Sequence, residues 1–255
     1  MKLGFESTVA RTIISSNLLN IMSKNFISAH ALQEAPRYNA SEAAHYLRVP
    51  VSTVRAWAFG QTYETKDGTK HFRSVIELAD RHGKKLSFVN LVELFVLAAI
   101  RRRHGVALRE VRKALDYLKK KFPSKHPLAD NQLETDGIDL FVEKFGEYLA
   151  INTEGQLVIR ELITQRLRSV LRDENGNPLK LVLISRASAD GPQGVVVIDP
   201  RLGFGRPVID GTGIRTEVII DRFRAGERLE SIADDYGRPA ADIEEIVRAE
   251  MPLAA

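Results

Sequence analysis

The sequence predicts a mainly α-helical protein with small β elements (α+β): an N-terminal winged helix-turn-helix, a small central sheet and a C-terminal three-helix module of helix-turn-helix type. Two short helical patterns separated by Pro50 precede a hairpin signal at Asp67-Gly68. Two runs rich in β-branched residues lie at 179–184 and 194–198. Three short helical patterns follow Thr216. Together these signals define the fold class.

The composition is that of an ordinary globular protein, with 44% hydrophobic and 27% charged residues in 255. A chain of this length can hold two domains with cores of their own. The absence of cysteine predicts a cytoplasmic protein without disulfides and removes thiolate metal ligands. The six histidines have no ligand-like spacing, so we expect no metal site and no cofactor.

Charge is unevenly distributed, although the formal net charge is only +4. Between Arg101 and Lys125 there are ten Lys and Arg residues against two acidic ones. From Asp221 to the C-terminus there are nine Asp and Glu residues against five Arg. A basic middle and an acidic end predict different partners for the two halves.

Residues 1–35 are expected to be an N-terminal extension with one short amphipathic helix over 12–22. We expect that helix to pack on the body of the protein or on a second subunit. Polar residues interrupt any apolar run, and no small-residue cleavage site follows, so the segment does not have the pattern of a signal peptide.

A helix-turn-helix is predicted from Tyr38 onward. Asn39 and Glu42 have the spacing of a capping box, and a helix over 41–47 follows. Pro50 ends that helix because proline has no amide hydrogen, and Ser52 can cap a second helix. The apolar seam between the two helices is expected to contain Ala43, Ala44, Leu47, Val54 and Trp57.

A basic hairpin, or wing, is predicted next, with strands over 62–66 and 69–73 around Asp67-Gly68. Short polar side chains near a helix N-terminus can reach base edges, and basic side chains on a hairpin can contact the phosphate backbone. The candidate DNA-binding residues are therefore Ser52, Thr53 and Arg55 on the second helix and Lys66, Lys70, His71 and Arg73 on the wing. The alternative is a generic helical pair with a solvated hairpin.

This stretch resembles the N-terminal DNA-binding domain of MerR-type regulators, in Tyr38-Asn39-Ala40-Ser41-Glu42-Ala43-Ala44 and in Ser52-Thr53-Val54-Arg55-Ala56-Trp57. Trp57 stands where that family usually has Tyr. The resemblance implies a DNA-binding domain over 36–122 that binds double-stranded operator DNA. A helix starting at Ser87, apolar almost all round, and a helix over 108–122 with a basic face would complete it. That face is either solvated or in contact with phosphate.

A linker and middle α+β region is expected over 123–194, where MerR regulators continue into a long dimerising coiled coil. The pattern predicts a helix over 138–149, a strand over 156–159 and a helix over 161–171, followed by two strands over 179–184 and 194–198 that pair antiparallel. This departure leaves the mode of dimerisation open.

The C-terminal module is predicted over 195–255. A hairpin leads into a helix over 217–224, capped by Thr216 and ended by Gly226, and further helices follow over 229–236 and 240–249. The apolar side chains of these helices are expected to form one small core: Ile219, Phe223, Leu229, Ile232, Ala233, Ile243, Ile246 and Val247.

This module resembles domain-of-unknown-function family 433 in Ile198-Asp199-Pro200, Gly205-Arg206-Pro207-Val208-Ile209, Gly211-Thr212, Ala225-Gly226-Glu227 and Ile232-Ala233-Asp234-Asp235-Tyr236. That family is found as the antitoxin of type II toxin–antitoxin pairs. Its members usually have Arg after Gly-Thr, where this chain has Gly213. Together with the MerR-like domain, the module resembles the larger VapB-type antitoxins, whose partners are PIN-like ribonuclease toxins.

The resemblances imply an antitoxin that neutralises a PIN-type ribonuclease and represses its own operon as a homodimer, with no membrane partner. We expect toxin contacts at Arg206 and Arg215, because guanidinium groups pair with metal-site carboxylates, or on the acidic C-terminal surface that contains Asp234 and Asp235. A structural salt bridge is the alternative for both arginines, and the middle region 138–190 is an alternative toxin surface.

A MerR-like regulator that senses a small ligand is the second reading. An enzyme is the third and weakest interpretation. Asp199, Asp210 and Asp221 form a conceivable carboxylate set, but no nucleophile, phosphate loop or His-carboxylate cluster accompanies them.

Overall fold

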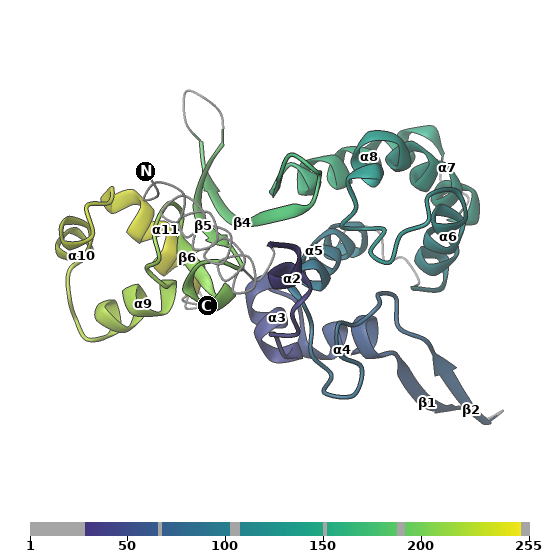
Figure 1. Cartoon of the computed structure of the whole chain (residues 1–255), viewed down its shortest axis with the longest axis horizontal. Helices are drawn as coiled ribbons and strands as arrows, with labels where there is room; N and C mark the ends of the chain where they lie inside the picture. Colours follow the sequence, from purple (N-terminus) through teal and green to yellow (C-terminus); the bar gives the residue numbers. More distant parts are fainter. Residues whose placement is uncertain (1–28, 66–67, 103–107, 150–151, 188–191, 251–255) are drawn as a thin grey trace, which may run out of the picture.

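The computed structural model describes residues 29–65, 68–102, 108–149, 152–187 and 192–250. The helix expected over 12–22 and the wing residue Lys66 lie outside the described residues. The wing projects from one end of the molecule, and the three C-terminal helices lie at the opposite end (Figure 1). The fold class predicted from the sequence is confirmed: a winged helix-turn-helix, a central sheet and a C-terminal helical trio are all present.

The helix-turn-helix is formed by α3 (Ala40–Leu47) and α4 (Val51–Phe59), preceded by α2 (Ala29–Glu34). The capping box is confirmed: the Asn39 side chain accepts from the backbone of Glu42 at 2.9 Å, and the Glu42 carboxylate accepts from the Asn39 amide at 2.9 Å. All five predicted seam residues are buried. The predicted cap at Ser52 is wrong, because α4 begins at Val51, one residue before Ser52. The Pro50 carbonyl accepts the first hydrogen bonds of the helix, from the amides of Thr53 and Val54.

The wing is the antiparallel pair β1 (Gln61–Thr65) and β2 (Gly68–Phe72). Because Thr65 pairs with Gly68, Gly68 belongs to the second strand and not to the turn, and the other predicted turn residue, Asp67, lies outside the described residues. The hairpin itself is confirmed.

The N-terminal core is centred on α5 (Phe88–Arg102), which packs against α2 and α3 and is buried on nearly every side. Helix α6 (Leu108–Lys121) follows it in the chain. Ser87 caps the N-terminus of α5, because its hydroxyl accepts from the Asn90 amide at 3.1 Å and the Asn90 side chain accepts from the Ser87 amide at 3.1 Å. This reciprocal pair satisfies two amides at the helix N-terminus.

The middle region contains a π-helical turn (Leu133–Gly137), α7 (Ile138–Leu149) and α8 (Thr153–Leu167). The predicted helix over 138–149 is confirmed. The predicted strand over 156–159 is wrong, because these residues lie within α8, which is capped by Asn152. The predicted helix over 161–171 is confirmed as far as Leu167, where α8 ends, whereas Val170 and Leu171 belong to a strand. The buried residues of this segment, Ile159, Ile163 and Leu167, recur every four residues. An α-helix places residues with this spacing on one face, so their burial agrees with a helix over this segment.

The central sheet has the order β3-β4-β5-β6, with antiparallel neighbours throughout. Its strands are β3 (Val170–Arg172), β4 (Pro178–Arg186), β5 (Gln193–Ile198) and β6 (Pro207–Ile209). The predicted pairing of β4 with β5 is confirmed. The sheet joins two apolar cores, since Leu181 and Ile198 belong to the N-terminal core and Val195 and Ile209 to the C-terminal one. The division into four regions stays a prediction.

The C-terminal module contains α9 (Thr216–Arg224), α10 (Leu229–Asp235) and α11 (Ala240–Glu250). The predicted core is confirmed, with Phe223 and Leu229 at its partly buried edge. The predicted cap at Thr216 is wrong: Arg215 is the N-cap residue, and Thr216 is buried in the first turn. Gly226 has φ +93°, a left-handed conformation that suits glycine after a helix end.

Candidate nucleic-acid interface and C-terminal surface

The candidate reading helix α4 has one buried and one open side. Val54 and Trp57 are buried against the core, whereas Ser52 and Arg55 are exposed and Thr53 is half-buried. An α-helix that presents polar side chains near its N-terminus can enter the major groove and contact base edges. The three predicted residues of α4 therefore lie close together on one accessible helix, although their contact with DNA stays a prediction.

The described basic residues of the wing lie on both of its faces. Lys70 pairs with Tyr63 across the hairpin, whereas His71 pairs with Thr62, and the Thr62 Oγ1 to His71 Nδ1 distance is 2.9 Å. Successive residues of a strand point to opposite faces, so Lys70 and His71 do not share a face. Together they give the wing a basic group on each side, as expected of a hairpin lying along a phosphate backbone.

Helix α6 holds the root of the wing. Arg73 forms an ion pair with Asp116 of α6, and the Arg112 guanidinium carbon lies 5.5 Å from the centroid of the Phe72 ring. Arg112 is only 7% exposed, so this residue of the basic face is neither solvated nor positioned like a free phosphate contact. These contacts fix the wing relative to α6.

The C-terminal module docks against α3 of the helix-turn-helix. The Tyr38 hydroxyl donates to the Gly205 carbonyl at 2.8 Å, and the Arg37 guanidinium donates to the Pro200 carbonyl at 2.8 Å. Arg206 lies 3.9 Å from Glu42 of the capping box. The loop before β6 is therefore in direct contact with the DNA-binding unit.

The predicted toxin-contact residues fall into two groups on the module. Arg206 and Arg215 share Glu217, at 2.7 and 3.5 Å, and each side chain is 41% exposed. Asp234 and Asp235 are exposed on α10, and Asp235 pairs with Arg222. Both arginines thus have an acidic neighbour within the chain but retain open surface.

The conceivable carboxylate set is divided among separate partners. Buried Asp199 accepts two hydrogen bonds from the Arg201 guanidinium, at 2.9 and 2.6 Å. Asp210 pairs with Lys180 at 2.7 Å, and Asp221 is exposed on α9. Among the described residues, no group of three or more His, Asp and Glu side chains is placed to hold a metal ion.

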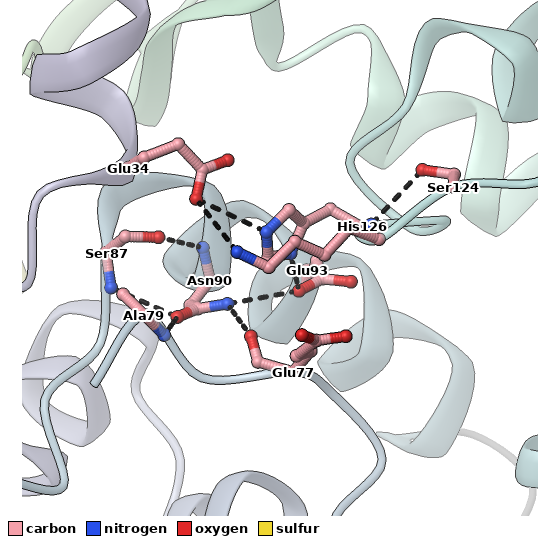
Figure 2. A network of polar contacts seen from close by, with 9 residues as sticks. Glu34, Glu77, Ala79, Ser87, Asn90, Glu93, Ser124 and His126 are labelled. Atoms are coloured by element: carbon pink, nitrogen blue, oxygen red, sulfur yellow. Dashed lines mark hydrogen bonds and ion pairs between the residues drawn. The ribbon is translucent and has the colours of Figure 1, made fainter. Parts of the chain in front are cut away.

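A buried polar network, which the sequence reasoning missed, lies against α5 (Figure 2). His126 Nδ1 lies 2.9 Å from Glu93, which is 1% exposed, and His126 Nε2 lies 3.4 Å from Glu34 of α2. Asn90 donates to the Glu77 carbonyl at 2.7 Å and accepts from the Ala79 amide at 3.1 Å. The available signal is Asn90 and Glu93, three residues apart inside an otherwise apolar helix. This network ties α2, α5 and the segment after α6 together.

The network predicts a stability that falls as the pH rises. Burial lowers the pKa of His126, but hydrogen bonds to Glu34 and Glu93 outweigh it and raise that pKa to about 9. A raised histidine pKa stabilises the folded state fully below about 6.5, and the contribution disappears as the pH passes 9. We expect the free energy of unfolding to decrease by up to about 3 kcal/mol between pH 6.5 and 9.5, measured by urea unfolding. A stability that is constant or rises over this range would contradict the ion pair.

A cavity of about 580 Å³ adjoins this network. Its lining includes Glu34, Lys125, His126, Asn131 and Asn177. Its polar lining is compatible with a small polar molecule.

The comparisons with known proteins agree with this architecture. The chain is 34% identical over 224 residues to the "Putative antitoxin VapB45" of Mycobacterium tuberculosis, with 80% of this chain and 89% of the relative covered. The chain belongs to the VapB45 family. A second relative of this VapB45-family chain, the "Uncharacterized protein Rv2308" of the same organism, is 25% identical over 87% of this chain and 92% of its own length.

Two family models cover the two candidate surfaces of this VapB45-family chain. Residues 36–115 match a model described as "Putative DNA-binding HTH domain", and residues 196–248 match "Protein of unknown function (DUF433)". The crystal structure of Rv2018 from Mycobacterium tuberculosis has the same fold, with a TM-score of 0.60 and 28% identity over 84% of this chain and 98% of that chain. The predicted helix-turn-helix and family 433 modules are both present, in support of an antitoxin and DNA-binding role. In the described part of the chain no helix has the length and apolar character needed to cross a membrane.

Proposed function

We propose that this VapB45-family chain is an antitoxin that neutralises a PIN-type ribonuclease and binds its own operator DNA as a homodimer. The observation that carries the proposal is the 34% identity to an antitoxin-named relative over most of both chains, together with a DNA-binding helix-turn-helix in the same chain. The chain acts by binding rather than by catalysis, because each candidate carboxylate is either paired or isolated.

In the proposed DNA complex, a dimer places two α4 helices in successive major grooves and two wings on the flanking backbone. On α4, Ser52, Thr53 and Arg55 contact base edges. The residues of the wing that contact phosphate are Lys66, Lys70, His71 and Arg73. The exposure of α4 and the fixed wing root support this assignment.

The proposed toxin surface lies on the C-terminal module, with Arg206, Arg215, Asp234 and Asp235 as contacts. The three helices of the module lie at the opposite end of the molecule from the wing (Figure 1), whereas Arg206 lies beside α3. This separation supports a single chain holding DNA and toxin at the same time.

Co-expression with the adjacent reading frame tests the proposal. The tagged full chain is expected to co-purify with the encoded protein, and the complex is expected to bind the promoter fragment of its own operon. Recovery of the chain alone, with no partner and no preference for that promoter, would contradict it. Light scattering on the same sample gives the stoichiometry and tests the dimer.

A regulator that senses a small ligand is the second candidate, and the cavity beside His126 is the observation that favours it. Promoter binding that changes with a small polar ligand, in the absence of any protein partner, would support this function instead.

A further inference from the structure

The loop between β5 and β6 exposes an aromatic side chain to solvent, and the backbone of that residue has an energetically unfavourable conformation. Phe204 is 90% exposed, and its backbone is left-handed, at φ +58° and ψ +29°. A bulky side chain makes this conformation energetically unfavourable. The ring gains no burial in return, so the isolated fold does not explain the arrangement. Backbone strain of this kind concentrates at functional sites.

The residues around Phe204 hold the loop in this shape. Gly203 and Gly205 also have positive φ, +52° and +76°. A Cβ atom on Gly203 would come within 2.6 Å of Val208, and one on Gly205 within 2.5 Å of the Tyr38 hydroxyl, so neither position has room for a side chain. The buried hydrogen bond from Tyr38 to the Gly205 carbonyl anchors the turn. The position of the loop that carries the ring is therefore fixed by packing and by a buried hydrogen bond.

Three arginine side chains on or beside this loop are partly exposed. The side chains of Arg201, Arg206 and Arg215 are 47%, 41% and 41% exposed. The Arg215 stem packs against the loop, because a Cβ on Gly203 would lie 3.4 Å from its Cγ. Aromatic and arginine side chains dominate the binding energy of protein interfaces, and rigid presentation lowers the entropy lost on binding.

We propose that Phe204 is the apolar anchor with which this chain holds its ribonuclease partner. The ring would enter an apolar pocket on the partner, and Arg201, Arg206 and Arg215 would face carboxylates at the rim of that pocket. This inference rests on the proposed function and adds to it the residue that carries the contact. The position supports a protein partner: the loop belongs to the family 433 match and precedes β6, at a distance from the wing (Figure 1).

The test measures the affinity of the full chain for the protein encoded by the adjacent reading frame. Phe204→Ala is expected to weaken binding at least about 30-fold, the effect typical of an aromatic hot spot. Phe204→Trp retains a ring and is expected to stay within about threefold of the wild type, by the same reasoning. The comparison variant is Leu157→Ala, which removes another exposed apolar side chain, 57% exposed on α8 within the alternative toxin surface 138–190, and is expected to leave binding unchanged. Loss of binding in Leu157→Ala but not in Phe204→Ala would overturn the anchor role.

Phe204→Gly separates binding from folding. Glycine accepts the left-handed backbone without strain, so this variant is expected to melt at the wild-type temperature or above it while binding as weakly as Phe204→Ala. Loss of binding together with a lowered melting temperature in this variant would overturn the anchor role, because the side chain would then be structural.

The outcomes distinguish this inference from the function on which it rests. If the wild-type chain binds and inhibits the ribonuclease and Phe204→Ala does so equally well, the anchor is wrong and the antitoxin function stands. If the wild-type chain binds no such partner, both the anchor role and the antitoxin function are contradicted. If Phe204→Ala instead lowers the mass of the chain alone in solution, the ring joins two copies of this chain and the toxin anchor is overturned.

Discussion

Replacing His126 with leucine is expected to lower the free energy of unfolding by about 3–5 kcal/mol. His126 bridges Glu93 and Glu34, and Glu93 is almost fully buried. Without the imidazolium, the Glu93 carboxylate has lost its cation inside the core and must either remain charged there or take up a proton. Urea unfolding at pH 7 measures the effect.

The matched control removes both charges at once. Glu93→Leu combined with His126→Leu removes both partners of the buried pair, so neither is left unpaired and most of the lost stability is expected to return. Glu34→Gln, at a carboxylate that is 25% exposed, is expected to cost less than the single His126 variant. A His126→Leu protein within about 1 kcal/mol of the wild type would contradict a charged network, given the size expected for a broken buried pair.

Replacing Arg55 with alanine is expected to weaken binding to the operator by about 10- to 100-fold, the range for one base-contacting arginine. Arg55 is exposed on α4, whose buried side is fixed by Val54 and Trp57, so the substitution leaves the core intact. Fluorescence anisotropy with the promoter fragment and with an unrelated duplex measures both affinity and specificity. The difference between the two duplexes should shrink.

Two further variants give this experiment its controls. Arg228→Ala removes an equally charged and highly exposed arginine at the start of α10 and is expected to leave DNA binding unchanged. Lys70→Ala, on the wing, is expected to weaken binding to all duplexes alike and to reduce the salt dependence by about one charge. Equal effects of Arg55→Ala and Arg228→Ala would contradict the assignment of α4 as the reading helix.

Local signals predict the helix-turn-helix well, because its determinants lie close together in the sequence. The capping box of Asn39 and Glu42, the break at Pro50 and the seam ending at Trp57 are all read within twenty residues. The same holds for the C-terminal trio, whose helix ends are marked by Gly226 and by the turn after α10.

Features that depend on distant contacts are not predictable in this way. The β-branched residues and turn-like start of α8 favour a strand, and only the burial of Ile159 and Ile163 against other helices makes the segment helical. His126 meets Glu93 across 33 residues of sequence. Phe204 is distinguished by its backbone conformation and exposure, for which the flanking glycines are the only sequence signal.

The central claim, that this chain is an antitoxin, is tested most directly by titrating the purified partner ribonuclease with the full chain. The ribonuclease encoded by the adjacent reading frame is first shown to cleave RNA alone. Cleavage is expected to fall in proportion to the added chain and to be abolished at a fixed, low molar ratio. Undiminished cleavage in the presence of a large molar excess of correctly folded chain would contradict it.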